Sequence, residues 1–140
     1  MYNFIQKFHS GWAYLAILVL VIAVVNSFIG KSSSKDFTNK DRKIALFALI
    51  GTHIQLLVGL VLYFLSPLGA AVFGEMKEAS LRLTSLEHPL INIIAIVFIT
   101  IGWSKHKKAD TSEAKFKSIA IFYGLGLVLI LSRIPWSLWF

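Results

Sequence analysis

Cysteine is absent from the sequence, which excludes disulfides, iron–sulfur clusters, thiolate zinc sites and cysteine nucleophiles. Charge is also scarce, because only 15% of the 140 residues are charged, whereas about a quarter are charged in a typical soluble domain. Hydrophobic residues make up 56% of the chain and come in long blocks, which excludes a disordered chain, a collagen-like repeat and a coiled coil. The composition is that of an integral membrane protein.

Acidic side chains are few, and their positions exclude several kinds of catalysis. All seven lie in expected loops or at the ends of apolar runs, so a proton relay or a cation site built on buried carboxylates is not expected. The sequence also offers no Ser/His/Asp set, no glycine-rich phosphate loop and no pair of carboxylates for acid–base chemistry. The sequence leaves open whether the protein is an enzyme.

Long apolar runs are what the sequence has instead. A membrane-spanning helix needs about 20 mostly apolar residues, and four such runs fit within the length of one domain. Short connectors make consecutive spans antiparallel neighbours. The predicted fold is an all-α membrane protein, a four-transmembrane antiparallel helical bundle in a single domain 1–140, with spans at about 9–30, 44–65, 84–106 and 117–138.

Basic residues give the expected orientation of this bundle. Ten of the fourteen lie in two connectors, 31–43 and 105–117, which are on the same side. Lys and Arg concentrate on the cytoplasmic side of membrane proteins, so these connectors are predicted to be cytoplasmic and both termini to lie on the outer side. The net charge of +7 is then a topology signal, and nucleic acid is not an expected partner, because the basic residues flank spans.

Two of the four histidines are the predicted metal ligands. His9 and His88 stand at the outer ends of the first and third spans, which run in the same direction and lie diagonally across an antiparallel bundle. Two imidazoles at similar depth on opposite helices are what a b-type haem iron requires. Zinc would normally need a third protein ligand, and copper stays open as an alternative.

The other two histidines are weaker candidates. His53 falls near the middle of the second span. It is the reserve metal ligand, with contact to a second haem or a quinone as further alternatives, but a hydrogen bond to a neighbouring helix is its favoured role. His106 lies among lysines at the cytoplasmic end of the third span and is predicted to be a solvated interfacial residue.

Three more residues are expected to shape the haem site. On the second span, Gln55 and Gly59 belong to a stripe of small and polar residues that recurs every three or four positions. This stripe would make room for a flat macrocycle, although small residues also serve helix packing. Arg133 is the one charge in the predicted fourth span, level with His9 and His88. Its guanidinium would suit a haem propionate, with snorkelling to lipid phosphate as the alternative.

These features resemble a family of small four-span bacterial membrane proteins usually called cytochrome b. The likeness covers nearly the whole chain and rests on four short motifs, which are Phe8-His9-Ser10, Thr52-His53-Ile54-Gln55-Leu56-Leu57-Val58-Gly59 with Leu62-Tyr63, Leu86-Glu87-His88 and Ile134-Pro135-Trp136. A more distant likeness is to the four-helix half of haem A synthase. There a histidine opens one span, a Gln-x-x-x-Gly motif and a Leu-Pro-type turn follow, and a histidine opens the third span.

The resemblance implies that His9 and His88 are the axial ligands of one haem b near the outer face, in the bacterial cytoplasmic membrane. It leaves His53 without a counterpart. Haem A synthase has two such four-helix units and this chain has one, so synthase activity is not implied. The expected function is one-electron transfer, either between a quinol and an outer acceptor or as a small subunit of a larger respiratory complex. The alternatives are a haem-free structural subunit and a haem-modifying or quinol-oxidising enzyme.

Overall fold

The computed structural model describes residues 1–139 and is built from helices joined by short connections. Its four long helices are α1 (Tyr2–Ser32), α2 (Asn39–Leu65), α4 (His88–Lys108) and α5 (Ser112–Ser132). The shorter elements are the 3-10 turn η1 (Ala70–Val72), α3 (Ala79–Arg82), the π-helical turn η2 (Leu83–Glu87) and α6 (Trp136–Trp139). Phe140, the last residue of the predicted domain, lies outside the described residues.

Four segments are long and apolar enough to cross a bilayer, namely α1, α2, α5 and the continuous stretch from α3 through α4. Many large apolar side chains face outward from them, among them Leu18, Ile22, Phe47 and Val128. An aqueous surface would not accommodate so many, whereas lipid is their natural solvent. The predicted all-α fold with four membrane-spanning helices is therefore confirmed, and the chain is a multi-pass membrane protein.

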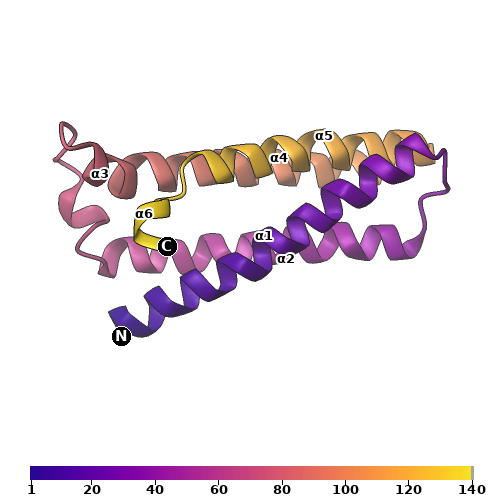
Figure 1. Ribbon diagram of the computed structural model, residues 1–140. Coiled ribbons are helices and arrows are strands. Elements are labelled where there is room, and N and C mark those ends of the chain that lie inside the picture. The colour runs from indigo at the N-terminus through magenta and orange to yellow at the C-terminus, as the bar shows by residue number, and fades with distance from the viewer. Residues whose placement is uncertain (140) are drawn as a thin grey trace.

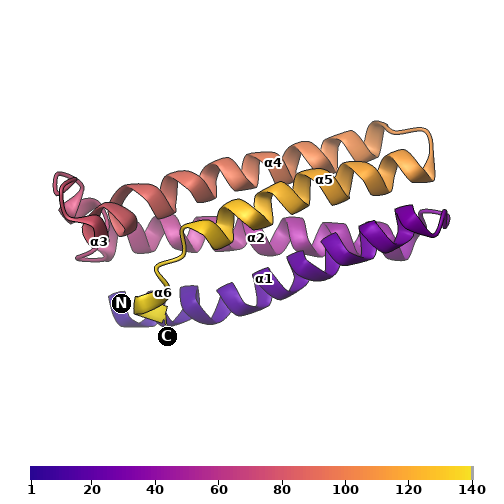
Figure 2. The same ribbon diagram turned by 45° about the horizontal axis from the view of Figure 1, so that its top comes forward.

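The helices form an antiparallel bundle in which each packs against two neighbours (Figures 1 and 2). The packed pairs are α1 with α2, α2 with α4, α4 with α5, and α5 with α1. As the sequence predicted, the first and third spans therefore lie on one diagonal. Both chain ends and the long connector after α2 lie at one end of the bundle, and the two short connections lie at the other (Figure 1).

Helix starts at the end with the short connections follow ordinary capping chemistry. Thr38 and Asp41 form a capping box at the start of α2, and the Thr111 hydroxyl accepts the amide of Ala114 at the start of α5. The Asp41 carboxylate is only 2% exposed, and it also accepts hydrogen bonds from Asn26 and Lys35. A buried carboxylate is tolerated here because every one of these partners is a donor.

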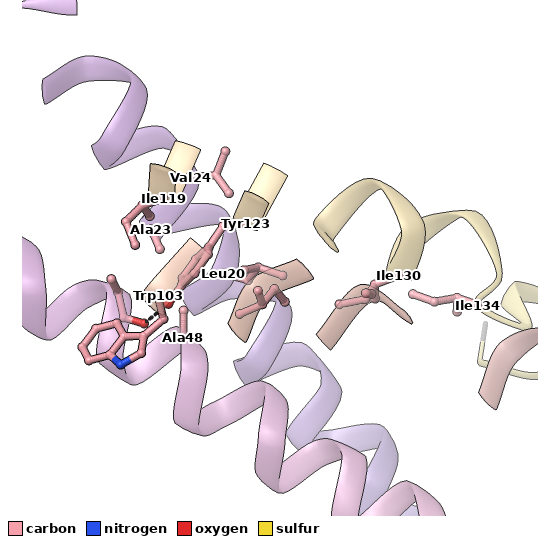
Figure 3. Close-up of a cluster of buried hydrophobic side chains, with 12 residues drawn as sticks. Leu20, Ala23, Val24, Ala48, Trp103, Ile119, Tyr123, Ile130 and Ile134 are labelled. Carbon is pink, nitrogen blue, oxygen red and sulfur yellow. Dashed lines mark hydrogen bonds between the residues drawn. The ribbon is translucent and has the colours of Figure 1, made fainter. Parts of the chain in front are cut away.

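The core is packed most closely on the side of these connections. Tyr123 is fully buried and donates to the carbonyl of Ala45, which joins α5 to α2 (Figure 3). Glycines let α4 and α5 approach, since a Cβ at Gly126 would lie 2.7 Å from Ile99 Cγ1 and 3.0 Å from the carbonyl oxygen of Ala95. Such close contacts through small residues are a common means of helix association in membranes.

The helix bounds differ from the predicted spans, since α2 begins at Asn39, α5 at Ser112 and the third segment at Ala79, each five residues early, and two further differences bear on the site. Helix α1 begins at Tyr2 instead of near residue 9, so His9 lies within a helix and not at its start. Helix α5 ends at Ser132, whereas the predicted span ran to 138. Pro135 accounts for the early end, because proline lacks an N–H and disfavours helical conformation in the residue before it. Arg133 is thus beyond the fourth helix and not inside it.

A second proline shapes the third segment just before the site. Pro89 lies one turn beyond Ser85 and has no N–H to bond the carbonyl of Ser85. The helix widens there into the π-helical turn η2. The Tyr63 hydroxyl of α2 donates to this free carbonyl at 2.8 Å. The wide turn therefore connects α4 to α2 immediately before His88.

Candidate functional site

His9 and His88 meet across the diagonal of the bundle. Their ring centroids are 6.3 Å apart, and the ring planes are perpendicular. His9 comes from α1 and His88 from the first residue of α4. The sequence placed these two histidines at similar depth on opposite helices, and the structure brings their rings together.

The rings lie in a cleft between the helices with a volume of about 220 Å³. A buried water needs only about 10–15 Å³ of such space, so the cleft is large enough for a cofactor ring system or a small organic molecule. Its walls are mostly apolar, and the polar side chains among them include His9, Thr52, Gln55, Tyr63, His88 and Asn92. Apolar walls with a few convergent polar groups are typical of ligand sites.

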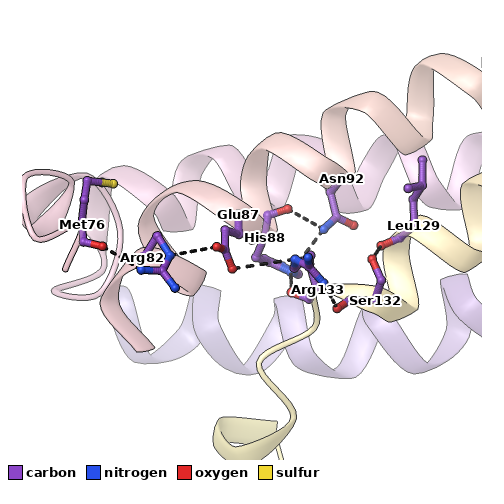
Figure 4. Close-up of polar contacts among 8 residues, drawn as sticks. All are labelled: Met76, Arg82, Glu87, His88, Asn92, Leu129, Ser132 and Arg133. Carbon is purple, nitrogen blue, oxygen red and sulfur yellow. Dashed lines mark hydrogen bonds and ion pairs between the residues drawn. The ribbon is translucent and has the colours of Figure 1, made fainter. Parts of the chain in front are cut away.

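The backbone after α5 orients the His88 ring. Its Nδ1 lies 2.9 Å from the carbonyl oxygen of Arg133, which can only accept a hydrogen bond, so Nδ1 carries the proton (Figure 4). The Asn92 amide is 3.2 Å from the same nitrogen, but it has a better partner in the His88 carbonyl at 2.6 Å. This arrangement leaves Nε2 of His88 as the unprotonated nitrogen, the one able to bind a metal.

Gln55 and Gly59, which the sequence placed on one stripe of the second span, both contact His9. The Gln55 side-chain amide donates to the His9 carbonyl at 2.8 Å. A Cβ at position 59 would lie 3.2 Å from Cε1 of His9, so glycine is what lets the ring lie against α2. Nδ1 of His9 and Oε1 of Gln55 are both buried, and neither has a hydrogen-bond partner among the described residues. One is a potential donor and the other an acceptor.

Arg133 does not line the cleft, because only its carbonyl bonds to His88 and its guanidinium lies beside Glu87. The guanidinium Nε is 3.7 Å from Glu87, which also accepts a hydrogen bond from Arg82 at 2.9 Å (Figure 4). Its Nη1 donates to the carbonyl of Ser132. These contacts form a partly exposed ion-pair network next to His88. The sequence drew attention to Arg133 for its charge, whereas the contact with His88 comes from the backbone, which no residue type signals.

The remaining histidines lie outside the cleft. His53 bonds to the carbonyl of Leu49 and to the hydroxyl of Thr100 on α4, at 2.7 and 3.3 Å. The prediction of an interhelical hydrogen bond at His53 is confirmed. The prediction that His106 is solvated is wrong, because its side chain is only 2% exposed and packs against Trp103 and Phe37. The α1–α2 connection folds over it, an approach between distant segments that local sequence does not reveal.

The donor set of the site is therefore two imidazoles. Among residues 1–139, no group of three or more His, Cys, Asp or Glu side chains could hold a metal ion. A bare zinc ion normally takes at least three protein ligands, so this set does not suit zinc. Two imidazoles suit a metal whose other coordination positions are already filled, as they are in a haem.

Comparisons with known proteins do not assign the chain to a family. No family model matches the chain, and no curated protein and no solved structure was found to match it. The resemblance to the small four-span cytochrome b family consequently stays a prediction that rests on the sequence motifs.

Proposed function

We propose that the protein binds one b-type haem between His9 and His88. The observation that carries the proposal is the separation of the two rings. Two imidazoles that bind one metal ion from opposite sides, at about 2 Å each, have ring centroids about 6 Å apart, and the centroids here are 6.3 Å apart. Perpendicular planes are compatible with this arrangement, because each ring is free to rotate about the nitrogen–metal axis.

The polar atoms around the rings fit a pair of axial ligands. The Arg133 carbonyl holds the proton of His88 on Nδ1, while Nδ1 of His9 and Oε1 of Gln55, whose amide donates to the His9 carbonyl, are both buried without a hydrogen-bond partner among residues 1–139. A metal-bound histidine usually donates its other N–H to a carbonyl or carboxylate, which fixes the ring and raises its basicity. Both histidines can therefore present Nε2 to the cleft.

A haem bound here would supply one-electron chemistry at its iron. The apolar walls of the cleft would exclude water, and the two imidazoles would occupy both axial positions, so the site favours electron transfer over binding of a substrate to the metal. We propose a quinol as the electron donor, or a larger respiratory complex in which the protein is a small subunit. In the proposed orientation, the cleft is near the outer face of the bacterial cytoplasmic membrane.

A visible spectrum of the protein purified from membranes tests the proposal. We expect a reduced-minus-oxidised difference with sharp b-type α and Soret bands and about one haem per chain. The low-spin signature of two imidazole ligands should be present in both oxidation states. A featureless spectrum from well-folded protein expressed with sufficient haem would overturn the proposal and favour a haem-free structural subunit.

A further inference from the structure

At the end of the bundle opposite the haem site, the two basic connectors pack together. The amide of Phe37, between α1 and α2, donates to the Ser112 hydroxyl at the start of α5 at 2.8 Å. The Phe37 ring lies on His106 and Phe116, with centroid distances of 5.3 and 4.9 Å. Positive charges that are separate in the sequence are thereby gathered around one depression.

This depression has a volume of about 440 Å³, and three cations line it: Arg42, Lys107 and Lys115. No carboxylate is among its lining residues. The acidic residues of the two connectors, Asp36, Asp110 and Glu113, do not line it, and Asp41 is paired with Lys35 at 3.0 Å. Within residues 1–139, none of the three lining cations forms an ion pair. The three like charges therefore lack a counter-ion.

A buried histidine forms part of the wall. The Nδ1 of His106 donates to the carbonyl of Trp103 at 2.7 Å, because the carbonyl can only accept. Its Nε2 forms no hydrogen bond in the described part of the chain, and it is not fully enclosed, so it remains accessible from the depression that His106 lines. An accessible imidazole nitrogen at the wall can accept a hydrogen bond from a bound group. Lys115 and Arg42 are already held in place, by a bond to the His106 carbonyl and by the face of the Trp103 ring.

We infer that this depression, lined by Arg42, His106, Lys107 and Lys115, is a binding site for a phosphate group. A phosphate oxygen would be the counter-ion of the three cations, and a protonated phosphate or a bridging water would give His106 Nε2 its partner. The chemistry is shared by a phospholipid headgroup and by free phosphate. Basic pockets between helices on the cytoplasmic side are suited to anionic headgroups, and the inference does not depend on haem binding.

Thermal unfolding of the purified full-length protein tests this site. The protein is measured in nanodiscs of phosphatidylcholine alone, in nanodiscs with added phosphatidylglycerol, and in phosphatidylcholine nanodiscs with inorganic phosphate at constant ionic strength. The lipid that stays bound is counted by native mass spectrometry. The test variant is Arg42→Gln/Lys115→Gln, and the matched control is Lys40→Gln/Lys108→Gln, which removes two charges from the same connectors but none from the depression.

We expect phosphatidylglycerol to raise the melting temperature of the wild type and of the control. In the test variant, affinity should fall about five-fold for each cation removed. Stabilisation by inorganic phosphate as well would identify a free anion as a ligand, and stabilisation by phosphatidylglycerol alone would identify the headgroup. No stabilisation by either, or an equal loss in the control, would overturn the inference, because diffuse surface charge would then explain the effect.

A second variant covers the case in which the double variant does not fold. Lys107 is exposed and forms no side-chain hydrogen bond or ion pair with residues 1–139, so Lys107→Gln is expected to fold normally. Its affinity for phosphatidylglycerol should fall about five-fold, with Lys108→Gln unchanged. Equal affinity in the two single variants would contradict the site.

Discussion

At the scale of single residues, the two histidines of the cleft differ in how well their Nδ1 atoms are satisfied. His88 Nδ1 has the Arg133 carbonyl, whereas His9 Nδ1 is buried without a partner. A buried polar atom without a partner costs about 1–3 kcal/mol. A hydrogen bond to Nδ1, from a ligand or after a small movement of Gln55, would therefore stabilise His9 more than His88.

The first prediction concerns the ligands themselves. His9→Ala and His88→Ala should each abolish the low-spin spectrum, because either change leaves the metal with one axial imidazole. The loss in haem affinity should exceed the roughly 10–100-fold that follows removal of an outer partner. His53→Ala is the control, since His53 bonds to Thr100 outside the cleft. A normal low-spin spectrum in either cleft variant would remove that histidine from the ligand set.

The second prediction concerns Gln55 as a positioning residue. If its Oε1 accepts the Nδ1–H of a metal-bound His9, it makes the ring a stronger donor and stabilises the oxidised metal. Gln55→Leu should then raise the reduction potential. A hydrogen bond contributes about 1 kcal/mol, which corresponds to roughly 40 mV for one electron on the scale of about 59 mV per tenfold change.

Redox titration measures this shift, and Thr52→Val is its control. Thr52 also lines the cleft, but its hydroxyl bonds to carbonyls of its own helix. Its replacement should leave the potential unchanged. A Gln55→Leu potential equal to that of the wild type would mean that Oε1 does not reach the ring.

At the scale of helices, hydropathy predicted the number and order of the spans. The ends of the helices depend on proline positions and tertiary contacts, which a hydropathy pattern does not record. The length of an apolar run says nothing about Pro135, which ends α5 at Ser132, or about the helical residues that precede His9. The π-helical turn before His88 depends on Pro89 and on a hydroxyl from another helix. Tertiary contacts of this kind have no local signature in the sequence.

The third prediction tests the close packing of α4 against α5. Gly126→Ala would bring a methyl group to within 3.0 Å of the Ala95 carbonyl oxygen and 2.7 Å of the Ile99 side chain. Overpacking of this kind costs about 1–3 kcal/mol, and unfolding in mixed micelles should show the loss. Gly11→Ala is the matched control, because a Cβ there meets nothing within 4 Å. Equal stability of both variants would mean that the two helices separate easily.

At the scale of the whole molecule, the sequence predicted the diagonal placement of His9 and His88 and the position of Gln55 and Gly59 on the face of α2 that lines the cleft. These followed from helical periodicity and from the alternating direction of the spans. The burial of His106 and the role of the Arg133 carbonyl did not follow, since each depends on a segment that folds back from a distant part of the chain. Helical periodicity describes which residues share a face of one helix. It does not predict contacts between segments that are distant in the sequence, and both of these contacts are of that kind.

The fourth prediction is the orientation of the bundle. The native chain has no cysteine, so a single introduced thiol gives no background. Gly74→Cys lies at the end of the bundle that holds both termini, and Ser34→Cys lies at the other end. A membrane-impermeant thiol reagent added to intact cells should label Gly74→Cys alone, with both labelled after lysis. The reverse pattern would place the basic connectors outside.

The contact between His88 and Arg133 also has a consequence for biosynthesis. The His9 ring comes from near the beginning of α1. The Arg133 carbonyl, which orients the His88 ring, follows α5, the last of the long helices to be synthesised. No partly synthesised chain that lacks Arg133 can hold both rings in place. A cofactor held as proposed would therefore be bound only after all four helices have entered the membrane, and chains that stall earlier would not retain it.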